Sequence, residues 1–450
     1  MRTHQMADPR HLGPSLAALE TLPSHESPLP LVGAHEYAQD ADANSRVKEI
    51  LVEIGKQVAG SLPRKPAALL LTGSFARGEG SVLRVENKLR MLSDMEFLVV
   101  CPLGAGLENA QQNLNHLAKH LSGWLAAKAV ECEIEFSAVD HNYLRDLRPA
   151  IFSYELLAHA RTMWGDDKIL AAARRFPASE IPRWDAWRML NNRLLEQLQW
   201  ADISPRWGIR ELQSAFYHVL KCYLDMATAI LIFAGQYRSR YGERAEALEA
   251  WAGTASKEGV AFANELADRV SSCTAFKLHP DFGTLPLGVD LSQEPQRLCE
   301  DVRRTIVELV HTFHQVWRWA GNSFLGSKGK SLEEDVALQD AVLRSQPLRE
   351  KLRGWAKLAL MPEVRRRPQF LHQISRLLFK GSPRYLIYTV ASNLYFRLPD
   401  VIDGIAPEVE DQESLLPVSF ADRANAGGGW WRLRADVLFG WRLFLRNHWA

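Results

Sequence analysis

The chain has 450 residues, of which 47% are apolar and 24% charged, a composition typical of a globular protein with roughly two to four domains. Its 54 basic and 53 acidic residues nearly cancel, which argues against a general polyanion-binding protein but leaves room for a local basic groove. Five scattered cysteines without a Cys-x-x-Cys pair argue against a disulfide framework or a zinc site, and no signal-peptide pattern opens the sequence. We therefore expect a cytoplasmic protein without a transmembrane segment.

In chain order, regular patterns begin after a proline-rich stretch. Residues 1–40 show no periodicity, and the first amphipathic helix is predicted from about residue 44. Ala67–Thr72 is typical of a buried strand, followed by Gly73-Ser74 and a short helix. Glu96–Cys101 and Val130–Val139 are predicted as two further strands with a helix between them. This alternation predicts a small α/β unit.

Strand signals fade after about residue 170, and helical spacing dominates the rest of the chain. Predicted helices cover residues 187–200, 212–236, 244–251, 260–270, 299–319, 332–343, 348–360, 368–379, 385–396 and 432–446, with a Gly/Ser/Lys-rich linker at 321–330. The predicted fold class is α+β, with a small mixed-sheet domain followed by a large all-α region. The predicted divisions are an irregular tail at 1–40, the sheet domain at 41–170, a helical domain at 171–325 and a further helical region at 326–450.

Acidic residues gather where two of the predicted strands run. Asp94 and Glu96 are two positions apart, so both carboxylates point to one face of their strand. Glu131, Glu133 and Glu135 alternate along the next predicted strand and are candidates for a third carboxylate. Hard carboxylate oxygens suit Mg²⁺, and a bound cation relieves their mutual repulsion. The alternative interpretation is an exposed strand face without a ligand.

Donors for a phosphate-bearing ligand lie between the first strand and the helix that follows it. Gly73 lets the backbone approach phosphates, and the helix start supplies N–H groups. The Ser74 hydroxyl adds a donor, and Arg77 adds charge about one turn later. Ser93, beside the acidic pair, is counted with these nucleotide-binding candidates. No Walker-type lysine follows the glycines, so a P-loop is not predicted.

Two short stretches carry a family resemblance. Gly-Ser-Phe-Ala-Arg-Gly-Glu-Gly-Ser, followed by Ser-Asp-Met-Glu-Phe-Leu-Val-Val, resembles the nucleotidyltransferase superfamily that includes DNA polymerase beta. Over about residues 45–235 the chain is most similar to aminoglycoside nucleotidyltransferase-like proteins. The resemblance implies that Gly73 and Ser74 bind the triphosphate. It also implies that Asp94 and Glu96 hold magnesium.

The resemblance extends to residues farther along the chain. In the family a glutamate on a later strand acts as general base or third metal ligand, and Glu135 fits that context best, with Glu133 as second choice. Lys221 lies in a helix similar to the family's helical domain and is a weaker candidate for phosphate contact. The implied activity is transfer of a nucleoside monophosphate from ATP or another nucleoside triphosphate to a hydroxyl of a small molecule, with two Mg²⁺ ions.

One departure from the family pattern leaves the acceptor open. Ser74 and Asp94 are 20 positions apart, about twice the usual family spacing, and residues 82–92 are predicted to form an extended loop or an extra hairpin. The alternatives are a protein-AMPylating enzyme and a catalytically degenerate nucleotide-binding scaffold. A nucleic acid partner is not expected.

The C-terminal segment combines tryptophan and arginine. Its members are Trp430, Trp431, Arg432, Arg434, Trp441, Arg442, Arg446 and Trp449. We predict a helix docked on its own domain, with the arginines reaching the solvent. Weak contact with a membrane surface is the alternative.

Overall fold

The computed structural model describes residues 36–446, apart from 63, 86–87, 105, 205, 282–285, 291–292, 327–331, 366–369, 406, 408, 410–411 and 418–428. Most of the predicted tail, residues 327–330 of the predicted linker and Trp449 therefore lie outside the described residues. In the described part of that linker, helix α10 (Pro295–Leu325) continues to Leu325. The helix is therefore longer than predicted, and the linker prediction is wrong for residues 321–325.

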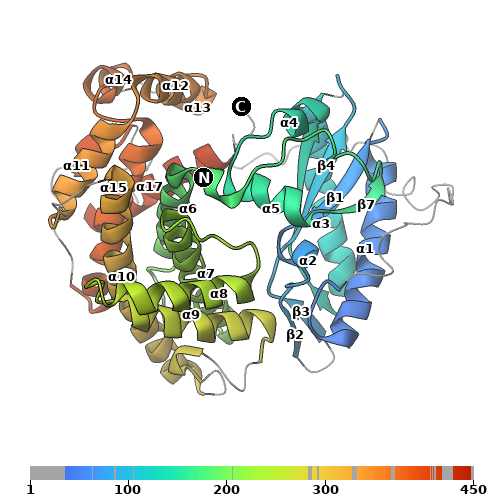
Figure 1. The fold of residues 1–450 in the computed structure, drawn as a ribbon, viewed down its shortest axis with the longest axis horizontal. Helices are drawn as coiled ribbons and strands as arrows, with labels where there is room; N and C mark the ends of the chain where they lie inside the picture. Colours follow the sequence, from blue (N-terminus) through green and yellow to red (C-terminus); the bar gives the residue numbers. More distant parts are fainter. Residues whose placement is uncertain are drawn as a thin grey trace, which may run out of the picture.

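A four-stranded sheet forms the centre of the N-terminal half (Figure 1). In spatial order its strands are β6 (Ile134–Asp140), β4 (Met95–Cys101), β1 (Ala68–Thr72) and β7 (Arg161–Gly165). Strand β1 runs antiparallel to both β4 and β7, whereas β4 and β6 are parallel. The sheet is therefore mixed, which confirms the coarse α+β prediction.

A smaller, three-stranded sheet contains β2 (Val82–Val85), β3 (Lys88–Met91) and β5 (Val130–Glu131). Strands β2 and β3 pair antiparallel, so the insert at residues 82–92 forms the hairpin, one of its two predicted alternatives. Strand β5 pairs with β3, and the chain then crosses to the larger sheet as β6. The prediction of one continuous strand at 130–139 is therefore wrong, because each half follows a different neighbouring strand.

The two faces of the larger sheet pack against different parts of the molecule. Leu69 and Leu71 belong to the core under the two covering helices, whereas Ala68 and Leu70 belong to the core of the helical half. Successive strand side chains point to opposite faces, so the buried run in β1 serves both cores. The covering helices are α1 (Ala41–Ser61) and α3 (Leu107–Ala127).

Helices make up the rest of the described chain. Between β1 and α10, in addition to α3, the helices are α2 (Gly73–Arg77), α4 (His141–Arg145), α5 (Ile151–His159), α6 (Arg183–Leu198), α7 (Ile209–Phe233), α8 (Tyr241–Ala255) and α9 (Ala263–Leu278). After α10 they are α11 (Asp335–Ser345), α12 (Leu348–Ala359), α13 (Pro362–Arg365), α14 (Phe370–Leu377), α15 (Pro383–Phe396), α16 (Leu398–Ile402) and α17 (Gly429–Arg446).

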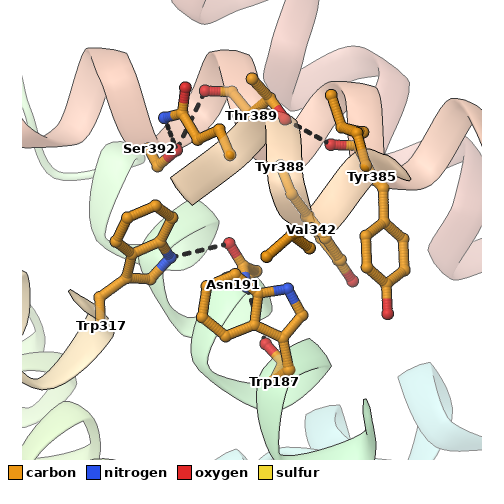
Figure 2. A pocket seen from close by; sticks show the side chains of 10 residues that line it. Trp187, Asn191, Trp317, Val342, Tyr385, Tyr388, Thr389 and Ser392 are labelled. Carbon is orange, nitrogen blue, oxygen red and sulfur yellow. Dashed lines mark hydrogen bonds between the residues drawn. The ribbon is translucent and has the colours of Figure 1, made fainter. Parts of the chain in front are cut away.

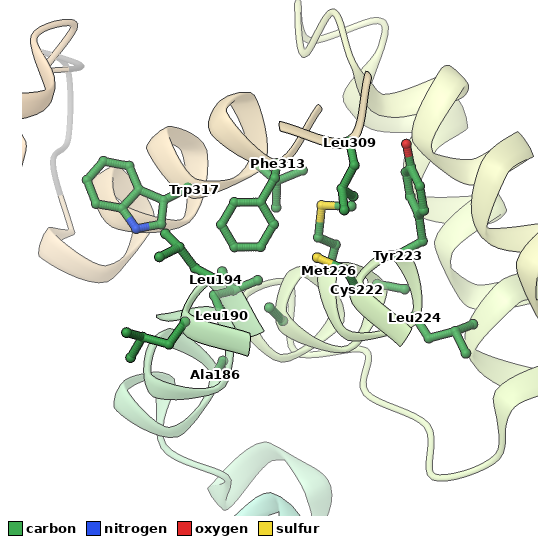
Figure 3. Close-up of a cluster of buried hydrophobic side chains, with 14 of the residues drawn as sticks. Ala186, Leu190, Leu194, Cys222, Tyr223, Leu224, Met226, Leu309, Phe313 and Trp317 are labelled. Atoms are coloured by element: carbon green, nitrogen blue, oxygen red, sulfur yellow. The ribbon is translucent and has the colours of Figure 1, made fainter. Parts of the chain in front are cut away.

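Helix α7 lies at the centre of the helical half. Figure 3 shows Met226 of α7 among apolar side chains of α6 and α10, such as Leu190 and Leu309. By length and composition alone α7 is apolar enough to cross a membrane, but 83% of its most apolar window is buried inside the protein. The same core extends from the sheet to α17, without a break at residues 170 or 325.

The tryptophan-rich C-terminal helix is docked on its own domain. Trp430 and Trp441 of α17 are buried, and the Trp430 indole donates to the Leu394 carbonyl at 3.3 Å. The Arg434 guanidinium donates to the carbonyls of Leu198 and Gln199. This position agrees with the predicted docked helix.

Candidate active site

The predicted acidic residues meet at the point where β4 and β6 begin. These strands are parallel, and Glu96 is paired with Glu135 in their register. Neighbouring residues of adjacent strands point to the same face, so the two side chains share one face. Asp94 directly precedes β4 and is two positions before Glu96. We call these three residues the acidic cluster. The register selects Glu135 from the three predicted glutamates.

The other two glutamates lie elsewhere. Glu131 belongs to β5 in the smaller sheet, where it pairs with Arg210 at 2.9 Å and with Arg90 at 3.8 Å. Glu133 is exposed in the crossing between the sheets, and its carbonyl accepts from the Met95 amide. The predicted common face for all three glutamates is therefore wrong, because the chain changes sheets after Glu131.

Gly73 fits closely against the acidic cluster. Its φ of +67° is a left-handed conformation that glycine adopts easily. A Cβ atom at this position would lie 2.6 Å from Glu96 Oε2, so any side chain would displace the carboxylate. Ser74, the next residue, is nearly buried. The strand–glycine–helix order is as predicted, but the space that Gly73 leaves open is filled by Glu96.

Negative charge in the acidic cluster is only partly balanced. Burial, together with the charges of Asp94 and Glu135, raises the pKa of Glu96 to about 7. Partial desolvation, and then the charges of Asp94 and Glu133, also raise the pKa of Glu135. Groups that are held together against their own repulsion are typical of functional sites.

Lys221 reaches the acidic cluster from α7, and its implied contact with phosphate stays a prediction. Its Nζ lies 3.5 Å from Asp94 Oδ2, and both side chains are about one-quarter to one-third exposed. Burial alone would lower the pKa of Lys221, but the negative charges of Asp94 and Tyr217 outweigh it and raise the pKa. The helical half therefore supplies a cation at the edge of the cluster.

A second lysine, which the sequence reasoning missed, lies beside the first. Lys277 of α9 is buried, and its Nζ donates to Ser93 Oγ at 2.7 Å and to the Tyr217 hydroxyl at 2.9 Å. Although burial alone would raise it, the charges of Lys277 and Lys221 hold the pKa of Tyr217 below its usual value. A signal was available, because Lys277 falls on the apolar face of α9, where lysine is rarely found without a role.

Two predicted nucleotide-binding residues have other partners. Ser93 is buried, and its hydroxyl also accepts from the Ser81 amide at 2.9 Å. It therefore fixes Lys277 in place instead of facing a ligand. Arg77 is buried too, and its guanidinium donates to Glu79 at 3.0 Å and to Glu155 at 2.6 Å. These contacts replace the predicted phosphate-binding roles of Ser93 and Arg77 with structural ones.

Arg77 belongs to a buried ion network that joins the sheet half to the helical half. Glu155 of α5 accepts from Arg77, from Arg244 of α8 at 2.6 Å and from the Tyr237 hydroxyl at 2.5 Å. Arg244 also donates to Thr228 of α7 at 2.9 Å. Burial alone would raise the pKa of Glu155, but the two arginines hold it below its usual value. We call this the arginine network.

Two cavities lie away from the acidic cluster. The first, of about 10 Å³, lies between α6, α10, α11 and α15 and is lined by residues such as Trp317, whose indole donates to Asn191 (Figure 2). It has room for about one water molecule. The second, of about 330 Å³, lies between β2 and the end of α9. Neither is lined by Asp94, Glu96 or Glu135.

Within the described residues, no group of three His, Cys, Asp or Glu side chains is arranged to hold a metal ion. The carboxylates of the acidic cluster have suitable chemistry for Mg²⁺, but Glu96 is turned toward Gly73 and Asp94 toward Lys221. No protein-family model, no curated protein and no solved structure matches the chain. The candidate site therefore rests on its own geometry.

Proposed function

We propose that the chain is a nucleotidyltransferase that uses the acidic cluster. The observation that carries the proposal is the register that places Glu96 beside Glu135 on adjacent parallel strands, with Asp94 at the start of one of them. Lys221 supplies positive charge beside these carboxylates, and Lys277 contacts Ser93, the residue before Asp94. Transfer of a nucleoside monophosphate from a nucleoside triphosphate requires anionic ligands for a metal ion and, next to them, cations that contact the phosphates.

The residues fit a magnesium site by chemistry. Three carboxylates carry more negative charge than Lys221 balances, as the raised pKa of Glu96 and Glu135 indicates, and hard oxygen ligands suit Mg²⁺. Asp94, Glu96 and Glu135 are the residues that would hold it. When bound, the metal would neutralise charge on the phosphates.

The chain's own groups then have separate tasks. Lys221 is placed to contact phosphate oxygens, and Lys277 holds Tyr217 and Ser93 in position behind it. The acceptor oxygen forms a bond to the α-phosphorus, the bond to pyrophosphate breaks, and the acceptor proton passes to the Glu135 carboxylate. Binding of the triphosphate by Gly73 and Ser74 stays a prediction.

The test is pyrophosphate release with magnesium, each nucleoside triphosphate and a library of hydroxyl acceptors. Asp94→Asn is expected to lower the rate by about a thousandfold, while Asp146→Asn, an exposed acid outside the cluster, is expected to keep the wild-type rate. An Asp94→Asn protein with the wild-type rate would show the proposal to be wrong. Asp146→Asn is expected to unfold at the wild-type urea concentration, and cooperative urea unfolding of Asp94→Asn shows that this variant is folded.

Labelled ATP distinguishes the classes of acceptor. A small labelled product supports a small-molecule acceptor, whereas label on protein bands supports AMPylation. A second candidate, a nucleotide-binding scaffold, is favoured by the direct Lys221–Asp94 contact, since a lysine there occupies one carboxylate. Nucleotide binding without turnover across the whole acceptor library would support the scaffold and exclude the enzyme.

A further inference from the structure

The segment from α12 to α14 differs in charge from the rest of the protein. Residues 344–384 contain eleven lysines and arginines but only two glutamates, in a chain whose net charge is +1. Figure 1 shows α12, α13 and α14 together at the end of the helical half, on the opposite side of the molecule from the sheet. Positive charge is therefore concentrated at one end of the protein.

The same helices expose large apolar side chains. Leu360, Leu371 and Phe379 are 81%, 77% and 72% exposed, and Leu348 and Leu352 are about half exposed. The opposite side of these helices is satisfied, because residues such as Trp355 and Phe370 form a small separate core. A folded helix pair that leaves several leucines and a phenylalanine in water is unusual, and such patches mark contact surfaces.

Apolar and basic side chains form two neighbouring rows on the exposed side of α12. Leu348 and Leu352 are one turn apart, and Arg349 and Arg353 follow them at the same spacing. All four side chains are exposed. In α14 and the turn after it, Leu371, Arg376, Phe379 and Lys380 are also exposed. The exposed surface is therefore amphipathic.

The positive charges are poorly compensated. Among the side chains that the structure describes, Arg349 and Arg353 are exposed and form no ion pair. Lys357 is affected by the same excess: burial, and then the charges of Arg353 and Arg384, lower its pKa. Such a field would be neutralised by an anionic partner.

We propose that the surface of α12–α14 docks the protein on a bilayer that contains anionic phospholipids. The leucines and Phe379 would enter the boundary between headgroups and acyl chains, and the arginines would contact the headgroups. This surface differs from the predicted position of membrane contact in α17, where Trp430 and Trp441 are buried and Trp431 is 36% exposed, whereas Leu348 and Leu352 of α12 are about half exposed. Aliphatic side chains favour lipid over nucleic acid, which uses aromatic stacking platforms.

The test is sedimentation of the full chain with vesicles of phosphatidylcholine alone or with added phosphatidylserine. We expect binding to the anionic vesicles only. Arg349→Glu with Arg353→Glu is expected to weaken it at least about tenfold, and Leu360→Ser with Leu371→Ser and Phe379→Ser by a similar factor. The matched controls are Lys119→Glu and Leu103→Ser, which change exposed residues of the sheet half and should leave binding unchanged.

Three results would overturn the proposal. One is the absence of binding to anionic vesicles by a wild-type protein that melts cooperatively. Another is full binding by the serine variants, which would reduce the contact to unspecific charge attraction. The third is loss of vesicle binding in favour of duplex or single-stranded nucleic acid when both are offered. Melting temperatures of all variants are recorded, because the changed side chains are exposed and should leave them unaltered.

Discussion

Two groups of charged residues lie close together in this chain, and they are built in opposite ways. In the arginine network, Glu155 meets two guanidinium groups and a tyrosine hydroxyl, and Arg77 also meets Glu79. In the acidic cluster, Glu96 and Glu135 lie side by side on adjacent strands, and Lys221 is the one cation in direct contact among the described residues. The arginine network is the more deeply buried of the two, because Arg77 and Arg244 are buried whereas Glu135 is exposed.

Charge balance also separates the two groups. The network lowers the pKa of Glu155, whereas the cluster raises the pKa of Glu96 and of Glu135. A group whose charges are balanced stabilises the fold that contains it. A group with excess negative charge lowers the free energy of unfolding, and a bound cation would restore it. The comparison predicts opposite responses when one charge is removed from each group.

The largest effect is expected in the arginine network. Glu155→Gln leaves Arg77 and Arg244 buried without their shared carboxylate, and loss of one partner from a buried pair costs about 3–5 kcal/mol. Urea unfolding measured by circular dichroism gives the free energy of unfolding directly. A loss below about 1 kcal/mol would mean that water, not Glu155, solvates these arginines.

Acidification is expected to lower the free energy of unfolding through His159, which lies at the edge of the same network. Burial, and then the charges of Arg77 and Arg240, lower the pKa of His159 to about 4. The unfolded chain takes up this proton near pH 6.5 and the folded chain only near pH 4, so stability falls as the pH drops through this window. We expect a loss on the order of 1–2 kcal/mol. Urea unfolding at a series of pH values measures this dependence, and His159→Gln should flatten it within the same pH window. An unchanged dependence in the variant would contradict the role of His159.

The acidic cluster is expected to respond with the opposite sign. Glu96→Gln removes one of three mutually repelling charges while it keeps the shape that fits against Gly73. The free energy of unfolding at pH 8 should rise by on the order of 1 kcal/mol, although pyrophosphate release is lost. Thermal melting of the variant and the wild type at the same pH measures this difference in stability. A fall in stability would show that the cluster is a structural group like the network.

The smallest effect is expected at an exposed ion pair, which serves as the reference for both groups. Arg174 lies 2.7 Å from Glu180, and both side chains are more than one-third exposed. Arg174→Ala should change the free energy of unfolding by less than about 0.5 kcal/mol in urea. A larger change would mean that an ordinary exposed ion pair contributes more than expected, and the free-energy changes measured for the two other groups would have to be compared with that larger reference.

Local patterns predicted much of the fold. The apolar run at 67–72, the acidic strand at 96–101 and most of the long helices were recoverable because burial imposes a period of two or 3.6 on one chain segment. The hairpin at 82–92 was one of two options. The split at residues 131–134 was not recoverable, since which sheet a strand joins depends on its distant neighbours.

The site was predicted in part for the same reason. Asp94, Glu96 and Glu135 lie in two strands whose pattern is local, and their alignment follows once the strands pair in register. Lys277 and Glu155 could not be assigned, because their partners are 184 and 78 positions away along the chain. The latter contact is also what turned Arg77 from a predicted ligand-binding residue into a structural one.

Helix α7 connects the two groups physically. It carries Lys221, which contacts Asp94, and Thr228, which contacts Arg244. These residues are seven positions apart, or about 10 Å along the axis. Insertion or deletion of a single residue between them would turn one of the two contacts away by about 100°. The length of this short stretch is therefore fixed, even though its individual apolar residues can be exchanged for others of similar volume.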